Sequence, residues 1–183
     1  YFTVGSSIRV NLAAGTVSKG PGLFTDTLRQ VEIITGTNQN DVYVATGFGG
    51  ASLNRNSYGE DFNLFSPRAG NDTVSGNGGT AINYNGVGGK ISVNLGLLTS
   101  ATAVAQIRTA YVDDTTTTAG FAAGTLTASG VNSVRGGAYD DSLTGGGRVN
   151  TSGSATTVSG DRSFEAFRGN GGNDFIDGRT GFD

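Results

Sequence analysis

The 183-residue chain contains no histidine, cysteine, methionine or tryptophan. Without histidine or cysteine it has no Ser-His or Cys-His nucleophile, no imidazole or thiolate zinc site and no disulfide bond. Apolar residues make up 36% of the chain, which is low for a compact globule, yet 10 Phe and 6 Tyr are too many for a disordered tail. These absences exclude the common catalytic machineries and favour a structure with a thin core.

Long apolar runs and clusters of positive charge are also missing. No segment approaches the roughly 18 consecutive apolar residues that a membrane-spanning helix needs, so we expect no membrane span. The 12 Lys and Arg residues are scattered, and the net charge is −3, so we expect no nucleic-acid partner. The avoidance of cysteine fits an exported bacterial protein and predicts an extracellular or cell-surface location.

Glycine, in contrast, is abundant. The 32 glycines follow no Gly-X-Y period, so they predict repeated turns rather than a collagen helix. Strand-like strings also recur: IRVNL at residues 8–12 returns as ISVNL at residues 91–95. Each string begins seven residues after a tyrosine, Tyr1 or Tyr84. The chain is therefore expected to be modular.

A second, longer string occurs four times, and it ends in a glycine-rich turn, an aspartate and a short strand. It reads VEIITGTNQNDVYV from Val31, NLFSPRAGNDTVSG from Asn63, VNSVRGGAYDDSLT from Val131 and FEAFRGNGGNDFID from Phe164. The eighth position of each nine-residue unit is apolar, and these positions are Ile34, Tyr43, Phe65, Val74, Val134, Leu143, Phe167 and Ile176. A six-residue turn followed by a three-residue strand forms half a coil of a flattened solenoid, and stacking of the coils is expected to bury the eighth positions in the core. The spacing predicts an all-β chain, a parallel β-helix or β-roll solenoid with irregular loop insertions.

The nine-residue unit resembles the RTX, or haemolysin-type, calcium-binding repeat G-G-x-G-x-D-x-U-x. The last 15 residues are the most similar: GNGGNDFID at 169–177 runs into GRTGFD at 178–183. Aspartate or glutamate takes the sixth position of the similar units at Asp41, Asp72, Asp141, Glu165, Asp174 and Asp183. Ala81 and Asn150 stand where the pattern has aspartate, so the turns before them lack this carboxylate.

The resemblance implies that the chain binds Ca²⁺. Calcium takes six to eight oxygen ligands, which turn carbonyls and aspartates of adjacent turns can supply. The implied ligands are Asp41, Asp72, Asp141, Glu165, Gly169, Gly171, Asp174 and Asp183. In the family two units form one coil, so Glu165 and Asp183, eighteen residues apart, would share an edge and Asp174 would lie on the other. The open alternative is that each Asn-Asp pair is an Asx turn that needs no metal.

We expect one elongated domain over residues 1–183 with three parts. Residues 1–62 form a first module, and residues 63–145 form a second module with a Thr- and Ala-rich insertion at 99–130. Residues 146–183 form a loop followed by the C-terminal cluster of RTX-like units. The insertion is expected to protrude from the stack, either as simple decoration or as a site for a cell-surface glycan.

No motif with catalytic spacing is present, so we do not expect an enzyme. The favoured function is an extracellular, calcium-stabilised scaffold segment, such as part of an S-layer, a matrix fibre or a large adhesin, whose copies associate head to tail. The resemblance equally permits a C-terminal secretion or folding module of a type I-secreted enzyme or toxin. Position 1 is not Met, and Asp183 falls inside a repeat unit, so we expect a processed product or an excerpt of a longer chain with tandem copies.

Overall fold

The computed structural model describes residues 1, 3–49, 62–95, 108–113, 125–145 and 166–179. Every helix or strand within these ranges is a β-strand. The strands are β1 (Arg9–Asn11), β2 (Thr16–Ser18), β3 (Thr25–Thr27), β4 (Ile33–Thr35), β5 (Val42–Val44), β6 (Asn63–Ser66), β7 (Asn71–Asn83), β8 (Lys90–Asn94), β9 (Arg108–Asp113), β10 (Thr125–Arg135), β11 (Ser142–Thr144), β12 (Ala166–Arg168) and β13 (Phe175–Asp177). The described residues contain no helix that is long and apolar enough to cross a membrane.

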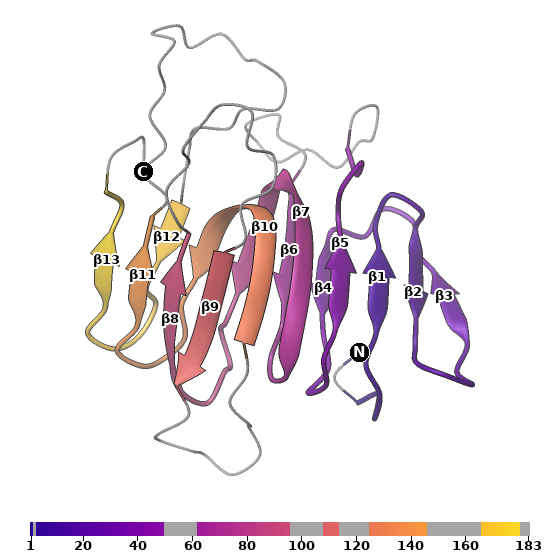
Figure 1. Ribbon diagram of the computed structural model, residues 1–183, viewed down its shortest axis with the longest axis horizontal. Coiled ribbons are helices and arrows are strands. Elements are labelled where there is room, and N and C mark those ends of the chain that lie inside the picture. Colours follow the sequence, from indigo (N-terminus) through magenta and orange to yellow (C-terminus); the bar gives the residue numbers. More distant parts are fainter. Residues whose placement is uncertain (2, 50–61, 96–107, 114–124, 146–165, 180–183) are drawn as a thin grey trace, which may run out of the picture.

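Most of the strands lie in one row, which we call the main row. Its order is β13-β11-β8-β9-β10-β7-β5-β1-β2-β3, and Figure 1 shows β13 and β3 at its opposite ends. A second row contains β4, β6, β12 and the later parts of β7 and β10, which are paired in parallel. The long strands β7 and β10 are curved and contribute to both rows (Figure 1).

The core is a thin layer between the two rows. Tyr43 on β5 and Phe65 on β6 are fully buried, and their rings stack with centroids 4.8 Å apart. The prediction that eighth positions face the core is confirmed for the six that are at most 3% exposed: Ile34, Tyr43, Phe65, Val74, Val134 and Leu143. Phe167 is partly buried, and Ile176 is 47% exposed on β13, the last strand of the main row.

The prediction of a parallel β-helix or β-roll solenoid is wrong, although the chain is all-β as expected. Four strand pairs, β1–β2, β2–β3, β8–β9 and β9–β10, are antiparallel, and strand lengths range from 3 to 13 residues. Parallel partners are also 17, 31, 33 or 50 to 54 residues apart along the chain, so the separation is not a constant eighteen. The nine-residue unit specifies one turn and one strand, but hairpins and long connections between units prevent a regular coil.

The predicted insertion at 99–130 is only partly described. Its residues 108–113 and 125–130 belong to β9 and β10, which lie inside the main row between β8 and β7. These residues therefore extend the sheet and do not protrude from it. Residues 99–107 and 114–124, like the predicted loop at 146–165, lie outside the described ranges.

The two halves of the chain repeat one strand arrangement. In the first repeat, β1, β2 and β3 follow β5 in the main row, as β8, β9 and the first part of β10 follow β11 in the second repeat. The registers agree residue by residue. The matched residues, first repeat then second, are Val10 and Val93, Val17 and Ala110, Asp26 and Leu126, and Tyr43 and Leu143.

The repeated tyrosines also occupy equivalent places. The amino group of Tyr1 donates to the carbonyl of Thr35 at 3.0 Å, and the N–H of Tyr84 donates to the carbonyl of Arg135 at 2.9 Å. Thr35 and Arg135 end equivalent strands, β4 and the later part of β10. The same equivalence relates β6 to β12 and residues 71–75 of β7 to β13, because both pairs have the same register with their neighbours.

Candidate functional site: the Asx-Asp turns

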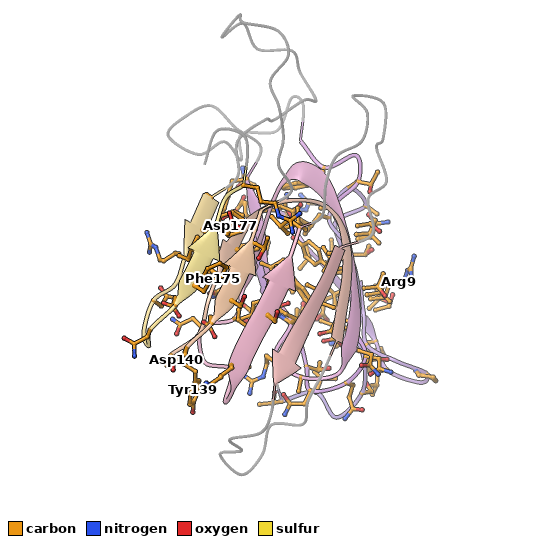
Figure 2. The ribbon with its side chains drawn as sticks, turned by 60° about the vertical axis from the view of Figure 1, so that its left-hand side comes forward. Arg9, Tyr139, Asp140, Phe175 and Asp177 are labelled. Atoms are coloured by element: carbon orange, nitrogen blue, oxygen red, sulfur yellow. The ribbon has the colours of Figure 1, made fainter. Side chains whose placement is uncertain are left out.

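Four turns place an Asn or Asp followed by an Asp directly before a strand of the main row. We call them the Asx-Asp turns, and they are Asn40-Asp41, Asn71-Asp72, Asp140-Asp141 and Asn173-Asp174. They precede or begin β5, β7, β11 and β13. In Figure 2 the turn residues Tyr139 and Asp140 lie at the lower edge of the strands, below Phe175 and Asp177 of β13.

Both oxygens of the Asp41 carboxylate accept hydrogen bonds from the protein. Its Oδ1 accepts the backbone N–H of Ile8 at 2.8 Å and the hydroxyl of Thr37 at 2.9 Å. Its Oδ2 accepts the backbone N–H of Thr37 at 2.6 Å. Since Ile8 precedes β1 and Asp41 precedes β5, this side chain joins the starts of two neighbouring strands.

Asp141 repeats these contacts in the second repeat. Its Oδ1 accepts the N–H of Ile91 at 3.0 Å, and its Oδ2 accepts the N–H of Gly137 at 2.6 Å. Ile91 and Gly137 hold the positions that Ile8 and Thr37 hold in the first repeat. The same local contacts therefore arise twice from different long-range connections.

Turn aspartates of neighbouring strands are also hydrogen-bonded to each other. The N–H of Asp41 donates to Oδ1 of Asp72 at 2.7 Å, and the N–H of Asp141 donates to Oδ1 of Asp174 at 2.9 Å. Each of these carboxylates thus accepts an N–H from the strand that comes earlier in the chain. The contact resembles one rung of a backbone ladder, with a side-chain oxygen in place of a carbonyl.

The preceding Asx residue makes the opposite connection. Oδ1 of Asn40 accepts the N–H of Asn71 at 2.9 Å, and Oδ1 of Asp140 accepts the N–H of Asn173 at 2.8 Å. The fifth position therefore accepts from the following turn, while the sixth position accepts from the preceding strand. Two hydrogen bonds of opposite direction therefore link each pair of neighbouring Asx-Asp turns, Asn40-Asp41 with Asn71-Asp72 and Asp140-Asp141 with Asn173-Asp174.

Glycine begins three of these four turns because the aspartate carboxylate lies against its Cα. A Cβ on Gly36 would meet Oδ2 of Asp41 at 2.5 Å, and a Cβ on Gly136 or Gly169 would collide with the carboxylate of Asp141 or Asp174. The same Gly136 Cβ would also collide with the carbonyl of Gly169 in the next turn. The glycines therefore make room for the carboxylate and for close stacking.

Three of the four sixth-position aspartates are buried: Asp41 is 1%, Asp72 is 3% and Asp141 is 2% exposed. Burial raises the pKa of Asp72 to about 8, a net value in which the N–H of Asp41 opposes the rise and the charge of Asp41 adds to it. Burial also raises the pKa values of Asp41 and Asp141, against the lowering effect of the N–H groups that they accept. The charges of Asp174 and Asp140 add to the increase at Asp141.

The predicted calcium ligands are brought together only in part. Asp72 lies next to Asp41, and Asp174 lies next to Asp141, whereas Glu165 and Asp183 lie outside the described residues. Across the described ranges no group of three or more acidic side chains is placed to share a metal ion. Calcium binding at these positions stays a prediction.

The donor chemistry fits calcium at one end of the chain better than elsewhere. Both oxygens of Asp41 and of Asp141 already accept N–H groups, and the buried Asp72 accepts the N–H of Asp41 through Oδ1, so these three fit a calcium site poorly. Asp174 is half-buried, and it lies in the glycine-rich turn with Gly169 and Gly171. Among the four described sixth-position aspartates, Asp174 alone is not buried, so solvent and a cation can reach its carboxylate.

A polar cluster that the sequence did not predict lies where β7 curves. Oδ1 of Asn63 accepts the hydroxyls of Tyr43 at 3.2 Å and Thr80 at 2.8 Å, and its Nδ2 donates to Oδ1 of Asn77 at 2.9 Å. The unit that contains Ala81 lacks the turn aspartate, and this cluster joins β6 to β7 instead. A polar Asn63 directly before the apolar pair Leu64-Phe65 was the available signal.

Comparison with known proteins adds no relative. No family model, no curated protein and no solved structure matches the chain.

Proposed function

We propose that the chain is a structural segment of an extracellular bacterial scaffold, such as an S-layer, a matrix fibre or a large adhesin, whose copies associate end to end. The observation that carries the proposal is the stacking of the first repeat on the second through β7 and β10. The role is structural and not catalytic, because the conspicuous polar side chains of the described turns are hydrogen-bonded to the backbone of neighbouring strands.

The junction between the repeats supports this proposal. Residues 71–75 of β7 pair with residues 125–129 of β10, and residues 80–83 pair with residues 131–135. Val74, Ile82 and Val134 are at most 2% exposed there, so the core continues from one repeat to the next. Repeat proteins gain stability through such nearest-neighbour contacts, and each added repeat offers a new edge.

Calcium enters the proposal at the C-terminal turn alone. We propose Asp174, Gly169 and Gly171 as ligands there, together with Glu165 and Asp183. Bound calcium would supply positive charge among these acidic side chains, and its binding energy would add to the stability of this turn. The buried Asx-Asp turns join their strands through N–H groups and need no ion for that role.

Further copies of the chain are the proposed partners, and residues 99–130 are a candidate site for a cell-surface glycan. Electron microscopy of the purified chain at increasing concentration, in millimolar calcium and in chelator, tests the scaffold. Fibres or sheets are the expected result. A folded monomer at every concentration in both buffers would contradict the scaffold and favour the alternative, a C-terminal secretion or folding module of a type I-secreted enzyme or toxin.

A further inference from the structure

The two end strands of the main row each have one pairing partner among the described residues. β13 pairs with β11, β3 pairs with β2, and Figure 1 shows these strands at opposite ends of the molecule. The N–H of Phe175 donates to Asp141, and the carbonyl of Asp177 accepts from Gly145. Because backbone groups alternate sides along a strand, the N–H and carbonyl of Ile176 point to the outer edge.

The core layer is open at the β13 end. Ile176 pairs with Leu143, which is fully buried, yet Ile176 itself is 47% exposed. Its counterpart in the first repeat is Val74, which is 1% exposed because β10 pairs with β7 on that side. The exposure of Ile176 is therefore what the first repeat would show without its neighbour.

The chain contains the complementary strand at its other end. Inside the molecule, residues 71–75 of β7, the counterparts of β13, pair in parallel with residues 125–129 of β10. The counterpart of residues 125–129 in the first repeat is the segment 25–29, which begins with β3. Within the described ranges, β13 and β3 are thus copies of two strands that already pair with each other, and each lacks that partner.

We propose, on the basis of the scaffold function above, that β13 of one copy pairs in parallel with β3 of a second copy in the register of the β7–β10 junction. That register places Thr27 opposite Phe175, because Thr127 lies opposite Thr73. It likewise places Leu28 opposite Ile176 and Arg29 opposite Asp177. The Leu28–Ile176 pair covers the exposed core position, and the Arg29–Asp177 pair joins opposite charges.

One position makes the contact between copies weaker than the contact inside the chain. Leu126 lies opposite Asp72 in β7, but its counterpart Asp26 would lie opposite Asp174. Two carboxylates side by side repel each other, and Lys19, 2.7 Å from Asp26, offsets this only in part. The copies therefore associate reversibly, and Asp26→Leu should tighten the contact.

Disulfide trapping tests the register, because the chain has no cysteine of its own. Neighbouring strands lie about 4.8 Å apart, which is within the Cα separation that a disulfide spans. A mixture of the Thr27→Cys and Phe175→Cys variants should give a cross-linked dimer under mild oxidation, at least about fivefold more than either variant alone. Thr27→Cys mixed with Asp177→Cys, which is two residues out of register, is the matched control.

Several outcomes overturn the inference. Equal yields from the matched and shifted pairs would exclude this register, and a dominant dimer of Phe175→Cys alone would indicate that β13 pairs with another β13. If fibres form but the matched pair does not cross-link, the β13–β3 contact is wrong and the scaffold proposal stands. If the copies do not associate at any concentration, both proposals fail.

Sedimentation equilibrium of two single variants, Ile176→Lys and Phe175→Lys, gives a second, independent test. Ile176→Lys should raise the dissociation constant between copies at least about tenfold, because the charge would be buried in the contact. Phe175→Lys should change it less than about threefold, since the equivalent Thr73 is exposed even inside the β7–β10 junction. Equal effects of the two lysines would contradict the proposed contact.

Discussion

Replacing Asp72 by asparagine tests whether Asp72 serves as a structural hydrogen-bond acceptor or as a calcium ligand. The carboxyl of Asp72 is 3% exposed, and burial raises its pKa from 3.8 to about 8. Asparagine keeps a side-chain oxygen that can accept the N–H of Asp41, but it carries no titrating proton. If Asp72 serves as an acceptor, Asp72→Asn should therefore be tolerated and should change how stability depends on pH.

The direction follows from proton linkage. A carboxyl whose pKa is raised on folding stays protonated in the folded protein while the unfolded chain ionises near pH 4, so its contribution to stability is lost as pH rises towards about 8. One proton gives a slope of about 1.4 kcal/mol per pH unit. Relative to wild type, the unfolding free energy of Asp72→Asn should therefore increase by about 2 to 3 kcal/mol between pH 5 and pH 7.

Urea unfolding followed by circular dichroism at pH 5, 6, 7 and 8, in chelator, measures this difference. Asp140→Asn is the matched control, because it also alters an Asx-Asp turn residue that accepts a backbone N–H, but at an exposed position. A difference between wild type and Asp72→Asn that is constant with pH would refute the reasoning. A variant that loses stability only when calcium is present would identify Asp72 as a metal ligand.

Three further changes test other parts of the site. Gly136→Ala should cost about 2 kcal/mol or more in thermal or urea unfolding, because its Cβ would collide with backbone, whereas Gly5→Ala, with no atom within 4 Å, should cost much less. Asp174→Ala should weaken calcium binding in titration calorimetry, from an expected dissociation constant of about 10⁻⁴ to 10⁻³ M, more than Asp113→Ala does; equal effects would exclude the C-terminal site. Asn63→Ala should cost about 2 to 4 kcal/mol, because the buried Tyr43 and Thr80 and the partly buried Asn77 each lose a hydrogen bond to Asn63, and a loss below about 0.5 kcal/mol would show that the cluster is dispensable.

The local part of the fold could be predicted from the sequence because it depends on short spacing. A turn, an aspartate and a strand with one inward apolar residue follow each other within nine positions, and burial of Tyr43, Val74 and Leu143 confirms that rule. Which strands become neighbours depends on parallel partners that lie from 17 to 54 residues away. Nothing local decides between an antiparallel hairpin such as β8–β9 and a regular parallel coil.

The role of the turn aspartates shows the same limit. The sequence allowed both a calcium ligand and an Asx turn, and the donors that distinguish them come from Ile8 and Ile91, far from Asp41 and Asp141 in the chain. The equivalence of Asp26 and Leu126 was also hidden, because TDTLRQ and TLTASG share few residues. Strand register reveals it, since pairing depends on backbone geometry more than on side-chain identity.

Hydrogen exchange at the amides bound by turn aspartates tests the central claim most directly. In chelator at pH 6, the N–H groups of Ile8, Asp41, Ile91 and Asp141 should exchange as slowly as the ladder N–H groups of β5 and β11, because each donates to an aspartate oxygen. Calcium should leave the first three almost unchanged and should act on Asp141 only through the C-terminal turn. Fast exchange of all four in chelator, with protection appearing only in calcium, would contradict the account and return the buried aspartates to the role of metal ligands.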